Sequence, residues 1–228
     1  MKDLFSRTRE LRHAESGKVL FSARVGDTRR LVQKAVEDDA DLEGVNLSRQ
    51  NLSGARYVQA RFNRARFIRA NLTRAELTGL NGHQADFSQS LMPHARMDRS
   101  DLREALFRGA ILRGANFREA HLQNARFGKH IGDEGPDPAD LMHADFRGAD
   151  LRGANFAGCD LTGAHFNVDQ LEGAIFAGAK GLDQVQLYSA TDAPLQGWVM
   201  TEDGPVEPAP PKAKRRHKIT PGTTGPAP

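Results

Sequence analysis

The stretch 65–79 decides the fold, because it reads as three consecutive blocks of five: Ala65-Arg66-Phe67-Ile68-Arg69, Ala70-Asn71-Leu72-Thr73-Arg74 and Ala75-Glu76-Leu77-Thr78-Gly79. The same phase holds for 18 blocks over residues 40–129 and for eight more over 139–178. The first position is Ala in 19 of these 26 blocks, and the third is Leu or Phe in 22, so the period is not accidental. A fixed short repeat predicts units that bury their apolar side chains only by stacking on their neighbours.

A period of five fits neither an α-helix, with apolar residues every three or four positions, nor a flat strand, with one at every second position. Within each block the apolar pair lies two residues apart, and the other positions hold Asn, Asp, Arg, Thr, Ser and Gly. Each block therefore predicts a very short strand with two inward residues, followed by a turn. Successive coils of such strands would stack about 4.8 Å apart.

These blocks resemble the Ala-(Asp/Asn)-(Leu/Phe)-x-x signature of the pentapeptide-repeat family, as in residues 144–148 and 149–153. The resemblance covers about residues 40–180. It implies an all-β fold, a right-handed quadrilateral β-helix with the third residue at the centre of each face and a small first residue inside. The stretch before Ala40 is also similar to the N-terminal leader of phage- and prophage-type members. The square closure is implied by the family, whereas spacing alone predicts strand, turn and stacking.

The third positions also predict how the coils are aligned. From Leu102 they alternate between Leu and Phe, and the alternation resumes after an interruption of turn-forming residues at 130–138. With four faces per coil, this predicts two opposite faces of Leu and two of Phe. Leu and Phe remain on their own faces after the interruption only if residues 130–138 form a loop between two adjacent faces and do not replace a face. We therefore expect one continuous ladder of Phe107, Phe127, Phe156 and Phe176.

Several blocks have unusual residues at inward positions, and three of these residues bear on packing or reactivity. Gly82 occupies a third position, where we expect a hole and a local distortion of the coil. Met92 also occupies a third position and is an adaptable filler. Cys159 replaces a first-position Ala, so we expect a small buried hydrophobic residue rather than a reactive thiol. A single cysteine forms no disulfide framework.

The segments around the repeat are expected to cover its ends, because a stacked solenoid otherwise exposes strand edges. Alternating residues over 18–25 predict a hairpin with 11–14, and Asp27 or Thr28 can cap a helix that runs to about Asp38. The chain after Thr201 has few apolar residues to bury, which favours disorder. The predicted division is an N-terminal hairpin-and-helix cap at 1–39, the solenoid at 40–182 with its loop at 130–138, a C-terminal helical cap at 183–200 that includes Trp198, and a disordered basic Pro-rich tail at 201–228.

The formal net charge of +3 conceals an asymmetry. Residues 40–129 hold 15 Lys and Arg against 8 Asp and Glu, whereas residues 139–178 hold 2 against 6. The rod is therefore expected to be basic towards its N-terminal end and acidic towards its C-terminal end. No apolar run approaches the roughly 20 residues of a transmembrane helix, and the start lacks an apolar signal segment. These features favour a cytoplasmic protein without a membrane partner, and the resemblance to the family implies a bacterial one.

The sequence motifs give no support to an enzymatic function. The chain has no phosphate-binding loop, dinucleotide fingerprint, zinc-ligand spacing or nucleophile elbow. Asp recurs at second positions because the repeat recurs, and a smooth rod offers no cleft to shift the pKa of a carboxyl group. We expect a non-enzymatic protein with no cofactor and no bound metal.

Candidate interaction residues lie at positions that should point outward. Leu91, Leu106 and Ile111 are apolar at second positions; Leu91 and Ile111 are expected to be neighbours on one face, with Leu106 round the corner. Four arginines share the fourth position of successive blocks and predict a belt around one coil: Arg103, Arg108, Arg113 and Arg118. The loop adds Asp133 and Glu134, and the basic tail adds Lys212, Lys214, Arg215, Arg216 and Lys218.

Three functions remain open from the sequence. The first is a rigid protein-interaction scaffold for an unidentified protein partner, with a homodimer as one arrangement. The second is a DNA-mimicking topoisomerase (gyrase) binder, implied by the resemblance to gyrase-protecting members. Mimicry of DNA implies a rod with a strongly negative charge, whereas residues 40–129 carry a net positive charge. The third is nucleic-acid binding through the basic end and the tail. Fold alone does not choose among them.

Overall fold

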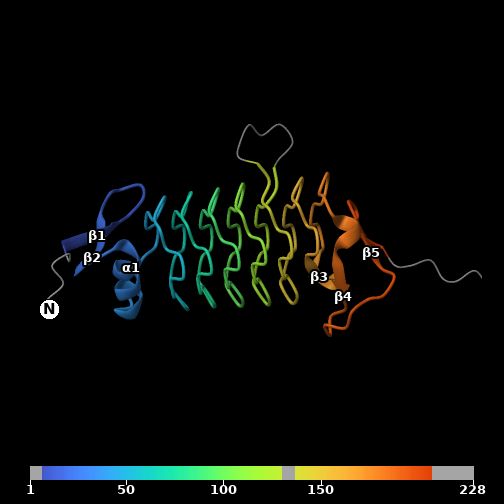
Figure 1. The fold of residues 1–228 in the computed structure, drawn as a ribbon, viewed down its shortest axis with the longest axis horizontal. Coiled ribbons are helices and arrows are strands. Elements are labelled where there is room, and N and C mark those ends of the chain that lie inside the picture. Colours follow the sequence, from blue (N-terminus) through green and yellow to red (C-terminus); the bar gives the residue numbers. More distant parts are fainter. Residues whose placement is uncertain (1–6, 130–136, 207–228) are drawn as a thin grey trace, which may run out of the picture.

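In this computed structural model residues 7–129 and 137–206 are described, and they form a rod of stacked coils (Figure 1). The second residue of a block forms a parallel bridge with the residue twenty positions later: Asn51 pairs with Asn71, and Asn71 pairs with Leu91. Twenty residues are four blocks, so each coil is a square of four short strands. The predicted four-sided solenoid is therefore present.

We name the four faces of the rod A to D, by the second-position residues that stack along each one. Face A comprises Asn46, Arg66, Asp86, Leu106, Arg126, Asn155 and Ile175. Face B comprises Asn51, Asn71, Leu91, Ile111, Asp140, Asp160 and Lys180. Face C comprises Arg56, Glu76, Arg96, Asn116, Asp145, His165 and Gln186, and face D comprises Arg61, Asn81, Asp101, His121 and Asp150. Each face also includes the other residues of the same blocks.

The core is a pair of phenylalanine ladders between ladders of leucine. Behind face A, neighbouring rings from Phe67 to Phe176 stack with centroids 4.8 to 5.3 Å apart and planes within 7°. Behind face C, the rings of Phe117, Phe146 and Phe166 stack at 5.0 Å. Each stacked pair contributes about 0.5–1.5 kcal/mol beyond the burial of its area. The predicted ladder through Phe107, Phe127, Phe156 and Phe176 is confirmed.

The fifth residue of a block turns the corner with positive φ, for example 55° at Arg64 and 58° at Arg69. The N–H of the next first residue donates to the third-position carbonyl, as from Ala70 to Phe67 at 2.9 Å. Positive φ at this position alone is the pattern of a type II turn. At the second position Asn or Asp accepts a further bond from the fourth N–H, 3.0 Å between Asn71 and Thr73. The recurring carboxylates and amides therefore build turns.

One corner is built differently, and its sequence explains why. Val168 is the only β-branched residue at a fifth position, and such residues are outliers at positive φ. Strand β3 (His165–Asn167) runs straight at this point, and the 3₁₀ turn η1 (Val168–Gln170) follows it.

The interruption leaves the stack of coils intact. Across it the bridges join residues 29 apart, as in Ile111 with Asp140 and Arg126 with Asn155, so the nine added residues displace no face. Ala139 donates its N–H to the Phe127 carbonyl at 2.9 Å, the same bond that closes other corners. Residues 130–136 lie outside the described part of the chain.

The distortion expected at Gly82 is wrong. A Cβ placed on Gly82 would lie 3.2 Å from Cδ2 of Leu80 and 3.1 Å from Cδ2 of Leu102. Leu80 replaces the usual first-position Ala and is fully buried. The ladder continues without a break, because the Gly82 N–H donates to Asp101 at 2.8 Å. Leu80 thus supplies the volume that Gly82 lacks.

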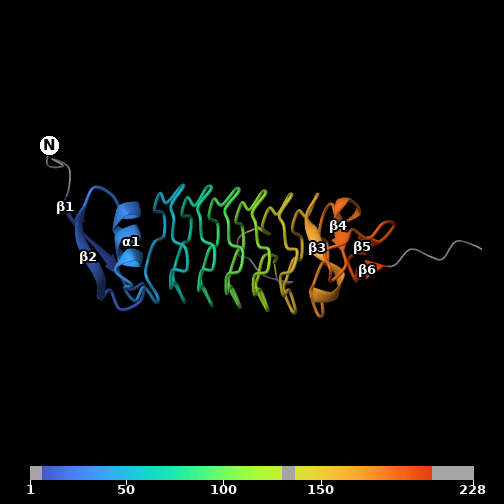
Figure 2. The same ribbon diagram turned by 90° about the horizontal axis from the view of Figure 1, so that it is seen from below.

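At the N-terminal end, β1 (Arg7–Arg12) and β2 (Val19–Val25) pair antiparallel, and α1 (Thr28–Glu37) lies between this hairpin and the first coil (Figure 2). The Asp27 side chain accepts from the Arg30 N–H at 2.8 Å and caps the helix. The buried face of α1, formed by Leu31, Val32 and Ala35, joins the same apolar core as the coils.

At the C-terminal end the helical cap expected at 183–200 is wrong. The described residues there include one 3₁₀ turn, η2 (Leu182–Gln184), and then β4 (Gln186–Tyr188), which pairs parallel with β3 and continues face C. The apolar and polar residues of 185–188 alternate, which favours a strand. Strands β5 (Val199–Thr201) and β6 (Gly204–Val206) form a hairpin, so 201–206 are not part of a disordered tail. Residues 207–228 lie outside the described part.

Deleting residues 130–138 is expected to leave the solenoid folded, because Lys129 would lead into Ala139 in register. Lys129 would then take the left-handed corner at a cost of about 1–2 kcal/mol, which Lys129→Gly removes. Circular dichroism and thermal melting of the deletion with and without Lys129→Gly measure this. An unfolded Lys129→Gly deletion variant would contradict the observed alignment.

Exchanging the volumes of Leu80 and Gly82 should restore an ordinary block. Leu80→Ala is expected to lower the free energy of unfolding by about 2–5 kcal/mol, and Gly82→Leu alone by about 1–3 kcal/mol through overpacking. The double variant should lose much less than the sum of the two. Urea unfolding measures all three, and strictly additive losses would show that the two positions do not share one space.

Candidate interaction surfaces

Leu91 and Ile111 form an exposed apolar pair on face B. They are bridged neighbours on successive coils, and they are 44% and 39% exposed. Leu106 lies on face A, half-buried between Asp86 and Arg126. The expected relative positions of the three apolar residues are confirmed. Their role in binding stays a prediction.

The arginine belt surrounds one coil, and most of it is engaged in intramolecular pairs. Arg103 donates two hydrogen bonds to Asp101, at 2.8 and 2.6 Å. Ion pairs also join Arg113 to Asp140, and Arg118 to Asp145 and Asp192. Exposed pairs of this kind contribute up to about 1 kcal/mol each. Arg103, Arg113 and Arg118 therefore hold the surface together rather than present free charges. Asp133, Glu134 and the tail residues lie outside the described part.

The pKa shifts of the paired carboxyl groups also bear on enzyme chemistry. Hydrogen bonds from the Arg103 side chain hold the pKa of Asp101 below its usual range, and Arg152 does the same for Asp150. A carboxyl group that acts as a general acid or base near neutral pH needs the opposite shift. These carboxylates therefore act as ion-pair partners.

Cys159 is fully buried, and burial raises the pKa of its thiol to about 12. The prediction of a small buried hydrophobic residue is therefore confirmed. Over residues 7–129 and 137–206, no group of three or more His, Cys, Asp and Glu side chains is arranged to hold a metal ion.

The positive excess of the solenoid lies on one face. The blocks of face A contain six cationic residues and one acidic residue, Asp86. The cations are Arg49, Arg66, Arg69, Arg108, Arg126 and Lys129. On faces B and C the charges of each sign are nearly equal in number, and face D, counted with blocks 40–44 and 169–173, holds more acidic than basic residues. When charges are summed along the sequence, the positive excess lies in residues 40–129, towards the N-terminal end of the rod. When they are summed over every fourth block, the same excess lies on face A.

Two of the hollows on the described surface lie beside repeat blocks with exposed arginines. A groove of about 560 Å³ follows face A, with Leu106, Arg126 and Asn155 among its lining residues and Glu104 at the neighbouring corner. A cleft of about 450 Å³ separates α1 from the first coil.

A polar network fastens the segment after β4 to face C. Arg147 donates to Asp145 at 2.8 Å, pairs with Asp192 at 3.5 Å, and lies 4.9 Å from the ring centroid of Tyr188. The Tyr188 hydroxyl lies 3.1 Å from Nδ1 of His165, whose ring stacks on the tyrosine. Burial is the main cause that lowers the pKa of His165. Burial acts to raise the pKa of Asp145, but hydrogen bonds from Arg147 outweigh it, and that pKa is lowered.

The sequence model of pentapeptide repeats matches the chain in 8 copies, over residues 40–79, 83–116, 100–129 and 139–178. These segments cover more than half of the chain, and they coincide with the four-sided coils. The chain belongs to the pentapeptide-repeat family. Its fold is therefore the right-handed β-helix of that family.

Comparison with individual proteins adds little to the family assignment. No curated protein matches the chain in sequence. Similar solved structures include full-length QnrB1, a plasmid-mediated fluoroquinolone resistance protein, with 20% identity, a TM-score of 0.32, and coverage of 64% of this chain and 83% of QnrB1. A pentapeptide-repeat protein of the Arabidopsis thaliana thylakoid lumen has 25% identity, a TM-score of 0.21, and coverage of 49% and 65%. These likenesses carry no argument about what this chain binds. None of the described helices is long and apolar enough to cross a membrane.

Stability is expected to fall as the pH drops below about 6.5. The pKa of His165 is lowered in the folded protein, so the unfolded chain, with a pKa near 6.5, takes up a proton first. Above that pH both states are neutral and the group contributes no dependence. His165→Gln should therefore lose less thermal stability than the unaltered protein between about pH 7.5 and pH 5.5. Identical losses in the two proteins would contradict this role of His165.

Proposed function

We propose that this pentapeptide-repeat protein is a non-enzymatic interaction scaffold, and that a protein partner docks on face B over Leu91 and Ile111. The observation that carries the proposal is the exposure of this pair, at 44% and 39%. Second positions elsewhere on face B hold polar or charged residues. Two branched apolar side chains on adjacent coils therefore form a local apolar centre.

The surroundings of the pair fit the anatomy of a protein interface, which has an apolar centre and a polar rim. Asn71 and Asp140 flank the pair along the same ladder. Arg113, two residues from Ile111, is held by its ion pair with Asp140. Backbone hydrogen bonds on both sides of each coil fix the spacing of these groups, so docking costs little ordering entropy.

We also propose that the hairpin and α1 cap the N-terminal end of the solenoid. The Arg12 carbonyl accepts from the Asn46 N–H at 2.8 Å, so the hairpin occupies part of the first coil's edge. An occupied edge is protected from pairing with another chain.

Affinity capture from native extracts, with quantitative mass spectrometry, tests the docking surface. The variant Leu91→Ser/Ile111→Ser should lose the partner. The matched control Val58→Ser/Ile175→Ser, with each residue 42% exposed on another face, should retain it. Capture of the same proteins by both variants would contradict docking on face B. The deletion of 130–138 shows in parallel whether that segment contributes.

Gyrase binding by DNA mimicry is the alternative that the charges disfavour. A DNA mimic presents negative charge along its length, whereas face A holds six cations against one carboxylate. In a supercoiling assay titrated with the protein, we accordingly expect neither inhibition of gyrase nor protection from a quinolone. Protection would favour the topoisomerase alternative over an unrelated partner.

A further inference from the structure

We propose that face A binds the phosphate backbone of a nucleic acid, through arginines that lack a carboxylate partner within the described residues. These are Arg49, Arg69 and Arg126, and we call them the face A strip. The proposal is independent of docking on face B.

Pairing distinguishes face A from the rest of the solenoid. On faces B, C and D, ten of the eleven repeat arginines form ion pairs with carboxylates, and Arg74 is the exception in the described part of the chain. On face A, Arg66 pairs with Glu15 at 3.1 Å. Arg69 donates to the neutral Gln89 at 2.6 Å. For Arg49 and Arg126, the described residues supply neither an ion pair nor a side-chain hydrogen bond. Lys129 pairs with Asp137 at 3.2 Å, so the strip is limited to three cations of this face that lack a carboxylate partner among the described residues.

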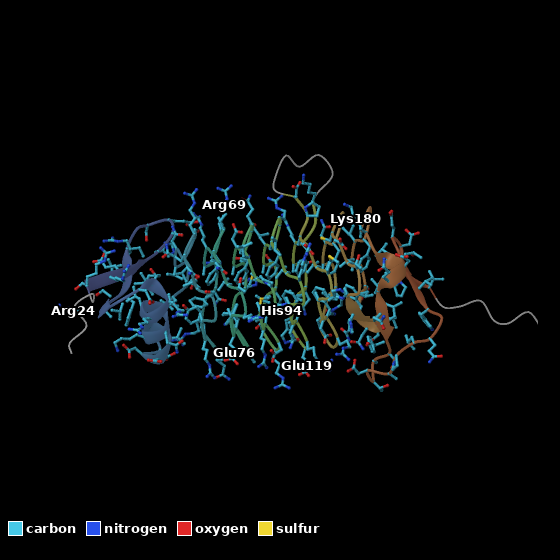
Figure 3. The ribbon with its side chains drawn as sticks, viewed as in Figure 1. Arg24, Arg69, Glu76, His94, Glu119 and Lys180 are labelled. Carbon is cyan, nitrogen blue, oxygen red and sulfur yellow. The ribbon has the colours of Figure 1, made fainter. Side chains whose placement is uncertain are left out.

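The strip follows the axis of the rod. Arg49 and Arg69 occupy the same corner on successive coils, and Arg126 lies on a coil three further along. The phenylalanines behind this face stack at 4.8 to 5.3 Å per coil, which sets the spacing of the rows. Arg69 projects away from the rod (Figure 3). The three cations lie along one side of the rod, Arg49 and Arg69 at its corner and Arg126 on the face, with Asp86 and Leu106 on the two coils between. Cations spread along one side can contact a linear polyanion, and the groove of about 560 Å³ that Arg126 lines extends along the same face.

The chemistry of the strip favours phosphates over an acidic protein. Guanidinium groups bind phosphate oxygens through two parallel hydrogen bonds. Apolar side chains are few on this face: Ile175 is 42% exposed and lines the groove together with the half-buried Leu106, and the other large apolar side chains of the described face A blocks are not exposed. The three arginines therefore lack the cluster of apolar anchors that is typical of a protein interface. The phenylalanines of these blocks are buried, so base stacking is not available there. The expected mode is contact with the backbone, without sequence preference.

Fluorescence anisotropy of the full-length chain with a labelled 20-base-pair DNA duplex, and separately with a labelled single strand of 20 thymidines, measures the binding. The test variant is Arg49→Gln/Arg69→Gln/Arg126→Gln. The matched control is Arg103→Gln/Arg113→Gln/Arg152→Gln, which removes the same charge from arginines that are internally paired. Equal thermal midpoints for the two variants establish that both are folded.

The face A variant should bind at least about tenfold more weakly at low salt. Its slope of log affinity against log salt should be smaller by about 2 to 3, since three phosphate contacts are lost at about 0.9 each. The control should bind like the unaltered protein. The probe that binds more tightly identifies a double or a single strand as the preferred form.

Several results would overturn the proposal. Equal weakening in both variants would mean that only net charge matters. Binding that survives the face A changes but disappears on deleting residues 207–228 would place the site in the tail. Failure of both probes to bind, or complete displacement by polyglutamate at an equal charge concentration, would exclude a nucleic-acid site here. Leu91→Ser/Ile111→Ser should bind both probes normally, which separates this site from face B.

Discussion

The rest of the structure depends on parallel backbone hydrogen bonds between successive coils, in which equivalent positions are twenty residues apart. The Phe67 N–H donates to Asp86 at 2.7 Å, and the Phe87 N–H donates to Leu106 at 2.7 Å, one coil further along. Such bonds force like positions to lie above one another. Ring therefore stacks on ring inside, and each outward side chain has neighbours twenty residues away rather than next to it in the sequence.

The sequence was most informative within the five-residue repeat, because the repeat determines both which side chains are buried and where the chain turns. The alternation of Leu and Phe predicted the continuity of the ladder across the interruption, because a shifted coil would have placed Leu141 in a phenylalanine ladder. Val168 was an available signal for the altered corner, since a β-branched residue resists positive φ. The pairing of β4 with β3 was harder to foresee. The local alternation of 185–188 favours a strand, but it does not say which strand will pair with it, and the partner is the open edge of face C at β3.

The candidate surfaces were only partly predictable. Leu91 and Ile111 could be placed as neighbours because their spacing of twenty is visible in the sequence. The sequence gives the number of arginines but not which of them are available for binding. A guanidinium group that pairs with a nearby carboxylate is less available to a partner than one that does not. Arg103 has Asp101 two residues away, whereas the partners of Arg118 include Asp192, more than seventy residues distant. Which arginines are paired therefore depends on the three-dimensional arrangement of the chain and not on local sequence.

Inward and outward positions of the repeat also have different roles. First and third residues fill the interior, second-position amides and carboxylates support the turns, and fourth and fifth residues are the least constrained by packing. Second-position side chains also point away from the core, so face A can have cations such as Arg126 while face B, one corner away, has the apolar pair Leu91 and Ile111. The two chemistries do not disturb each other because neither takes part in the core.

The pair Leu80 and Gly82 shows what the interior actually requires. The match to the family's repeat breaks between residues 79 and 83, where this pair lies, although the coil there is regular. One residue is too large for its position and the other too small, yet together they fill the layer. The requirement is a filled cross-section of the rod rather than a given residue at a given place. A larger side chain at one inward position can therefore compensate for a smaller one at another position of the same layer. Through such exchanges the repeat can become unrecognisable in sequence while the architecture is unchanged.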